Sequence, residues 1–164
     1  MTRIGVTGHM NLPPATQELI RQGLREFLTG YDPTDLTGIS CLAAGADSLF
    51  AECVLELGGS LEVVLPSGNY REQKVAPEQL PLFDELLRSA VHVHVMPFAD
   101  AGREAYEAAS ATLLDSSDVL VAVWDGLAPV DRAGTAAVVE LAQAQGLPVH
   151  IIWPHGAQRA SRPA

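Results

Sequence analysis

Positive charge is scarce in this chain. The 164 residues contain 10 Lys and Arg against 20 Asp and Glu, a formal net charge of -10 at pH 7, and the basic side chains are scattered rather than clustered. Such a surface repels the phosphates of DNA or RNA unless a local basic patch overcomes the repulsion. We therefore expect no nucleic acid among the partners of this protein.

Cysteine is rarer still, with two residues in the chain, and long apolar runs are missing. Cys41 falls in a predicted strand and Cys53 in a predicted helix, without a CxxC pair, which favours two buried thiols in a reducing compartment. No apolar stretch approaches the roughly 20 residues that a helix needs to cross a bilayer, and the N-terminus shows no secretory signal pattern. We expect a cytoplasmic protein with no membrane partner.

The remaining composition is that of a folded protein, with 48% hydrophobic and 18% charged residues. A chain of this length suits one hydrophobic core. We predict one domain over residues 1–154 and a mobile C-terminal tail over residues 155–164, which carry no periodic pattern.

Short β-rich runs alternate with segments of helical periodicity. Strands are predicted at residues 3–7, 38–42, 61–65, 92–96, 119–124 and 149–153. Five helices lie between them, from Pro14 to before Gly30, from after Asp47 to before Gly58, and over about residues 81–90, 103–114 and 135–145. This order predicts an α/β fold, a Rossmann-like doubly wound sheet of about six mostly parallel strands with helices on both faces.

In such sheets, ligands bind beyond the carboxyl ends of the strands, where helix N-termini converge. Four loops at these positions carry small or polar residues that suit a ligand, with glycines for close approach and helix N-termini for an anion. The candidate ligand-binding residues are Thr7, Gly8 and His9 after the first strand, Gly45, Ala46 and Asp47 after the second, Tyr70 after the third, and Asp125, Gly126, Gly134 and Thr135 after the fifth.

Structural roles explain several of these residues equally well. Asp47 is a good N-cap for the second helix, Asp125-Gly126 is a common turn dipeptide, and Thr135 could simply cap its helix. Tyr70 could stack on a ligand or lie on an ordinary surface.

Two histidines, His92 and His94, share one face of a predicted strand and could in principle hold a metal. No third ligand at fitting spacing accompanies them. We therefore interpret the segment as an edge strand or a partly solvated face, and we predict neither a metal site nor a cofactor.

These motifs, in this order, resemble the SLOG superfamily of Rossmann-like nucleotide-binding proteins, which includes the lonely guy phosphoribohydrolases, DprA and the YpsA-like proteins. The resemblance rests on residues 7–9, 40–47, 118–126, 134–135 and 146–149. The last part is also similar to nucleoside 2-deoxyribosyltransferases. The resemblance implies a site for a nucleotide or a nucleotide-derived small molecule at the strand ends.

The chain departs from both enzyme groups at their reactive glutamate, three residues after the threonine. Val138 stands at that position, and Glu140, two residues further, is rotated by roughly 200° around the helix. Asp131-Arg132-Ala133 also replaces the Pro-Gly-Gly lead-in of the phosphoribohydrolases. The resemblance therefore carries over the binding architecture and not the chemistry.

Three functional interpretations follow. The favoured one is a binding or sensing domain for a nucleotide-like small molecule. The alternative is an enzyme that cleaves an N-glycosidic bond with Asp47, Asp125 or Glu140 in place of the missing glutamate. A third is an interaction module with a vestigial pocket. An alanine-rich helical face that includes Ala105 and Ala109 would suit a homodimer or internal packing.

Overall fold

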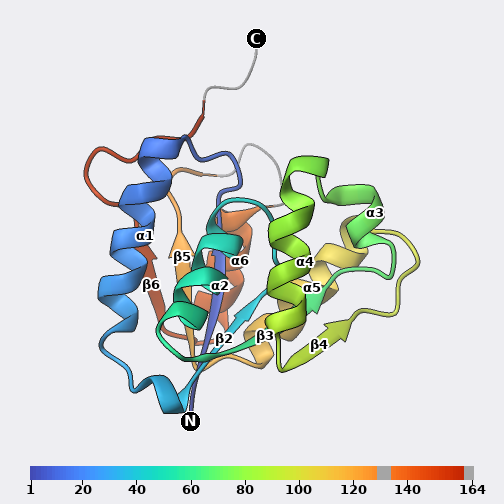
Figure 1. The fold of residues 1–164 in the computed structure, drawn as a ribbon, viewed down its shortest axis with the longest axis horizontal. Helices are drawn as coiled ribbons and strands as arrows, with labels where there is room; N and C mark the ends of the chain where they lie inside the picture. The colour runs from blue at the N-terminus through green and yellow to red at the C-terminus, as the bar shows by residue number, and fades with distance from the viewer. Residues whose placement is uncertain (129–133, 161–164) are drawn as a thin grey trace.

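Six parallel strands form the sheet at the centre of the molecule (Figure 1). The computed structural model describes residues 1–128 and 134–160. The strand order is β4-β3-β2-β1-β5-β6, and every neighbouring pair is parallel. The strands are β1 (Thr2–Gly8), β2 (Leu36–Ser40), β3 (Ser60–Leu65), β4 (His92–Val95), β5 (Val119–Val123) and β6 (Val149–Ile152). The prediction of a doubly wound α/β sheet is confirmed.

Helices cover both faces of this sheet. Figure 1 shows α1, α2 and α4 in front of the strands, with α5 and α6 behind them. The helices of the described residues are α1 (Pro14–Leu28), α2 (Ala46–Glu56), α3 (Tyr70–Lys74), α4 (Leu80–Ser89), α5 (Arg103–Asp115) and α6 (Thr135–Ala144), with 3₁₀ helices η1 (Pro33–Asp35) and η2 (Pro77–Gln79). Within these residues, every helix falls short of the length and apolar character needed to cross a membrane.

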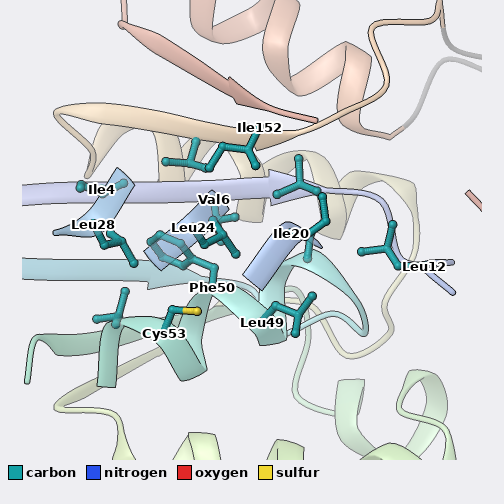
Figure 2. Packing of buried hydrophobic residues seen from close by; sticks show 14 of the residues in the cluster. Ile4, Val6, Leu12, Ile20, Leu24, Leu28, Leu49, Phe50, Cys53 and Ile152 are labelled. Carbon is teal, nitrogen blue, oxygen red and sulfur yellow. The ribbon is translucent and has the colours of Figure 1, made fainter. Parts of the chain in front are cut away.

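The core on the front face follows the helical spacing of α1. Ile20, Leu24 and Leu28, four residues apart, are buried against β1 and α2, as their periodicity predicts. Figure 2 shows Phe50 of α2 pointing into the same cluster, and its side chain is fully buried. Burial of one such side chain is worth roughly 1.5–3 kcal/mol. The cluster therefore fixes α1 and α2 on the sheet and positions the loops that precede them.

The second strand ends two residues earlier than predicted, so Cys41 lies in a loop and not in a strand. The Ser40 hydroxyl accepts a hydrogen bond from the Leu42 N–H at 3.1 Å and donates one to the Asp47 carbonyl at 3.1 Å. Leu42 adopts a φ of 55°, which turns the chain out of the sheet. This local bonding leaves no trace in the apolar pattern.

The prediction that Asp47 caps α2 is wrong. The N-cap is Gly45, with a φ of 80°, and Asp47 lies in the first turn. A Cβ on Gly45 would lie 2.6 Å from the carbonyl oxygens of both His9 and Met10, so only glycine fits where these two loops meet. The helix therefore begins at Ala46, two residues earlier than the capping signal indicates.

The segment after β3 also differs from prediction, because Tyr70 begins the short helix α3 instead of lying in a loop. The strand interpretation of His92 and His94 is confirmed, since β4 forms one edge of the sheet and both residues are exposed.

The start of the C-terminal tail packs against the loop after β1 and the first turn of α1. The backbone N–H of Ala160 donates to the Asn11 carbonyl at 2.8 Å, and that of Gln158 donates to the Thr16 hydroxyl at 2.9 Å. Residues 155–160 are thus held beside the strand ends, and the mobility of the tail stays a prediction.

Strand order reverses at β1. The chain runs outward through β2, β3 and β4, then returns to place β5 on the other side of β1. Consecutive connections leave β1 and β5 toward opposite faces, which opens a crevice at their carboxyl ends. This crevice is where the sequence places its candidate residues.

Candidate functional site

A cavity of about 860 Å³ opens beyond the carboxyl ends of β1, β2 and β5. Seven of the eleven candidate residues line it: Thr7, Gly8, His9, Asp47, Tyr70, Gly134 and Thr135. The other four, which lie close by without lining the cavity, are Gly45, Ala46, Asp125 and Gly126. The cavity therefore lies where the reversal of strand order predicts it, and its role as a ligand site stays a prediction.

Gly8 forms the point where three elements converge. A Cβ on Gly8 would lie 2.4 Å from the Ala46 Cβ and 2.7 Å from the Val123 Cβ, so β1, β5 and α2 can meet only if this residue is glycine. The Ala46 N–H, one of the free donors expected for an anion, is taken by the His9 carbonyl at 3.1 Å. The start of α2 is therefore bound to the β1 loop as well as facing the cavity.

His9 links the loops after β1 and β5. Its Nε2 accepts a hydrogen bond from the Asp125 N–H at 3.2 Å, which places the ring proton on Nδ1. Burial, and then the positive charge of Arg159, hold the pKa of His9 below its usual value despite the nearby Asp125 carboxylate. The ring also packs edge-on against Trp153. His9 is thus a neutral side chain that fixes one wall of the cavity.

The carboxylate of Asp125 is hydrogen-bonded within the turn that this residue begins. Oδ1 accepts the Leu127 N–H at 3.0 Å, and Gly126 follows with a φ of 81°. Oδ2 lies 3.9 Å from Arg159 Nη1. These contacts support the structural role of Asp125-Gly126 as a turn. Contact of Asp125 with a ribose stays a prediction.

A second group of polar residues comes from the loop after β2 and from the first turns of α2 and α3. Cys41, Asp47 and Tyr70, which we call the inner pocket, all line the cavity. Burial raises the pKa of the Asp47 carboxyl to about 7, against a small opposing effect of the hydrogen bond from the Ala43 N–H. Burial also raises the pKa of Cys41 and of Tyr70, so both are neutral at pH 7.

Cations and a helix N-terminus mark other parts of the cavity. Arg103, at the start of α5, and Arg159, in the tail, both line it and keep much of their side chains exposed. Gly134 is the N-cap of α6 with a φ of 107°, and the first helical N–H bonded back to it is that of Val138. Among the described residues, the three preceding N–H groups of α6 have no acceptor. N–H groups at a helix N-terminus suit an anion.

Val138, at the position of the enzymes' reactive glutamate, lines the cavity, whereas Glu140 is exposed and does not. The segment Asp131-Arg132-Ala133 lies outside the described residues. Among the described residues, the carboxylates that line the cavity are Asp47 and Glu107, and Glu107 pairs with Arg103 at 3.1 Å on the surface.

Sequence reasoning missed Arg103, Tyr106 and Arg159. The signal for the first two was available, because the α5 N-terminus follows β4 and belongs to the same edge of the sheet. Arg159 gave no local signal, since it reaches the site through tail contacts with Asn11.

No family model and no curated protein matches this sequence. Solved structures do resemble the fold. DNA processing protein A (DprA) from Streptococcus pneumoniae superimposes with a TM-score of 0.69 at 17% identity, over 95% of this chain and 52% of that one. The chain therefore shares the Rossmann-like α/β fold of these solved structures. It spans about half the length of the S. pneumoniae protein.

Two further structures widen the comparison. DprA from Helicobacter pylori gives a TM-score of 0.67 at 15% identity, over 96% of this chain and 68% of that one. The molybdenum cofactor carrier protein from Chlamydomonas reinhardtii gives 0.57 at 21% identity, over 92% and 75%. At these identities the similarity establishes the fold.

The expectation that nucleic acid is excluded is wrong. The H. pylori protein has this fold and is described as binding single-stranded DNA. Net charge averages over the whole surface, whereas an encounter with a nucleic acid depends on the field of a local patch. A total of -10 for the chain therefore does not decide the question.

Proposed function

We propose that this chain is a binding or sensing domain whose cavity holds a nucleotide or a nucleotide-derived small molecule. The observation that carries the proposal is the cavity of about 860 Å³ at the reversal of strand order, between the ends of β1, β2 and β5. Small-molecule sites typically measure 300–1,000 Å³ and occur at this point of doubly wound sheets.

The distribution of polarity within the cavity suits such a ligand. Most of the lining is apolar, with Leu113, Val138 and Leu141 among its residues, and these suit a planar ring. Arg103 and Arg159 offer positive charge, and the N-terminus of α6 offers backbone N–H groups, which together suit a phosphate. An ordinary nucleotide needs both kinds of surface in one site.

We further propose that residues 1–154 act as one domain in a reducing cytoplasmic compartment. Cys41 and Cys53 are both free thiols, which agrees with that placement.

A second function, cleavage of an N-glycosidic bond, is favoured by one observation. Asp47 lines the cavity with a pKa of about 7, which suits a general acid or base at neutral pH. Binding remains the better-supported function, because Val138 stands where the related enzymes hold their reactive carboxylate. Release of free base from a nucleoside monophosphate, lost in Asp47→Asn, would favour the enzyme.

Ala137→Glu should weaken binding of a nucleoside monophosphate by about ten- to hundred-fold. Ala137 lines the cavity in the first turn of α6, so a glutamate there repels a phosphate held at that N-terminus. The same charge stabilises the helix through its dipole, by about 0.3–1 kcal/mol. Loss of binding would therefore not reflect unfolding. Isothermal titration calorimetry measures the affinity, and thermal unfolding measures the stability.

Ala137→Gln is the matched control, because it adds nearly the same volume without the charge. We expect it to bind more tightly than Ala137→Glu. If both variants bind like the unmodified protein, the phosphate does not lie at α6 and the proposed orientation is wrong.

A further inference from the structure

Asp47 is a buried carboxylate that faces an open cavity. Its side chain is only 8% exposed, and it lines the cavity from the first turn of α2. Oδ2 accepts one hydrogen bond, from the Ala43 N–H at 3.3 Å. No buried side-chain nitrogen or oxygen of the described residues lacks a partner. Oδ1, which has no partner among these residues, is therefore open to the cavity.

Among the residues that the structure describes, none supplies a counter-charge to Asp47. Within residues 1–128 and 134–160, no lysine, arginine or histidine forms an ion pair with it. Besides burial, the nearby Asp47 carboxylate helps to raise the pKa of Cys41 and of Tyr70, and both are neutral at pH 7. A buried carboxylate without a cation is costly unless a partner donates hydrogen bonds to it. A ligand that carries N–H groups would supply such donors to the ionised form of Asp47.

The inner pocket also suits a flat ring. Tyr70 is buried and packs against Phe83, with ring centroids 6.1 Å apart. Tyr106, half exposed, lies edge-on to Tyr70 at 6.4 Å and continues the aromatic wall outward. Arg103 and Arg159, which suit the phosphate, are far more exposed than Asp47. This gradient favours a ligand whose ring enters first and whose anionic end stays near solvent.

Resting on the function proposed above, we propose that Asp47 selects a heterocycle that presents two adjacent N–H donors, the 2-amino-oxo edge that guanine shares with pterins. A carboxylate accepts two parallel N–H bonds from such an edge. Adenine presents a ring acceptor beside its amino group, and that lone pair repels the carboxylate. Hypoxanthine offers a single donor, and xanthine offers a donor beside a carbonyl.

Calorimetric titration of the full chain with GMP, AMP, IMP and XMP tests this selection. We expect GMP to bind about ten- to hundred-fold more tightly than the other three, the usual value of one bidentate pair. Asp47→Asn should reverse the order in favour of XMP, because an amide presents one acceptor and one donor that match the xanthine edge. Glu140→Gln removes the same charge from an exposed position outside the cavity and should leave the order unchanged.

Two more ligands test whether Asp47 binds the ribose instead of the base, or a pterin instead of a nucleotide. 2′,3′-Dideoxy-GMP lacks the ribose hydroxyls, and we expect it to bind like GMP. Preference for an intact ribose with no preference among bases would assign Asp47 to the sugar and overturn the inference. Binding of 6-hydroxymethylpterin, but of no nucleotide, would uphold the edge and overturn the nucleotide as its bearer.

Failure of this inference is distinct from failure of the proposed function. Equal affinities for all four bases, or an order unchanged by Asp47→Asn, would overturn the selection by Asp47 and leave nucleotide binding intact. Binding of none of the six ligands would overturn both.

Discussion

Replacing Gly45 with alanine should lower the free energy of unfolding by about 2–5 kcal/mol. A left-handed backbone costs an L-residue roughly 1–2 kcal/mol, and Gly45 has a φ of 80°. The new Cβ would also lie 2.6 Å from two backbone carbonyl oxygens, those of His9 and Met10. Backbone cannot rotate away as a side chain does, so the two loops must separate, at an overpacking cost of about 1–3 kcal/mol.

Substitutions at two other glycines separate the cost of backbone strain from the cost of steric overlap with a new Cβ. Gly146 has a φ of 74° with no atom within 4 Å of a Cβ, so Gly146→Ala should cost only the strain, about 1–2 kcal/mol. Gly68 has open space and no left-handed φ, and Gly68→Ala should change stability little. Urea unfolding at one pH measures all three variants. A loss at Gly45 no larger than at Gly146 would show that the close approach of the loops is not what requires glycine.

Asp47→Asn should stabilise the fold above pH 7 and change it little near pH 4. Burial raises the pKa of Asp47 to about 7 in the folded chain, against about 3.9 when unfolded. Between these values the folded state holds a proton that the unfolded state has lost, so the stability of the unmodified protein falls as pH rises. Above pH 7 the penalty is complete, on the order of 2–4 kcal/mol at about 1.4 kcal/mol per tenfold change in proton affinity.

The measurement is urea unfolding of both proteins at pH 4.5, 6 and 8 without ligand. The difference in unfolding free energy should grow with pH in favour of Asp47→Asn, because asparagine does not titrate. Glu140→Gln, at an exposed position, should show no comparable growth. A difference in unfolding free energy that stays constant from pH 4.5 to 8 would mean that the pKa of Asp47 in the folded protein is that of an ordinary carboxyl. Another contact would then have to stabilise the buried carboxylate.

The elements of the sheet were predictable because their signals are local. The four-residue spacing of Ile20, Leu24 and Leu28 fixes α1, and Pro14 marks its first residue. The β2 boundary was not predictable, since it depends on Ser40 bonding to Leu42 and Asp47. Hydrogen bonds of one serine hydroxyl to two backbone groups do not change the pattern of apolar residues from which strand ends are predicted.

The location of the cavity was predictable from sequence, whereas the contacts that its residues make were not. Loops after parallel strands share one edge of a sheet, so Gly8, Asp47 and Thr135 meet at one cavity. Asp125 follows its strand in the same way, yet its carboxylate bonds to Leu127 and its N–H bonds to His9, 116 positions earlier. Such pairing depends on the finished fold. Likewise, glycine at positions 8 and 45 predicts close approach of a ligand. In the structure, backbone and side-chain atoms of the protein itself make that close approach.

A crystal structure of the protein grown with GMP tests the central claim most directly. We expect electron density for one nucleotide in the cavity between β1, β2 and β5, with its phosphate near Thr135 and the arginines Arg103 and Arg159, and its ring beside Asp47. Density for the nucleotide elsewhere on the surface, or an empty cavity at a concentration that saturates binding in solution, would contradict the claim that this cavity is the ligand site.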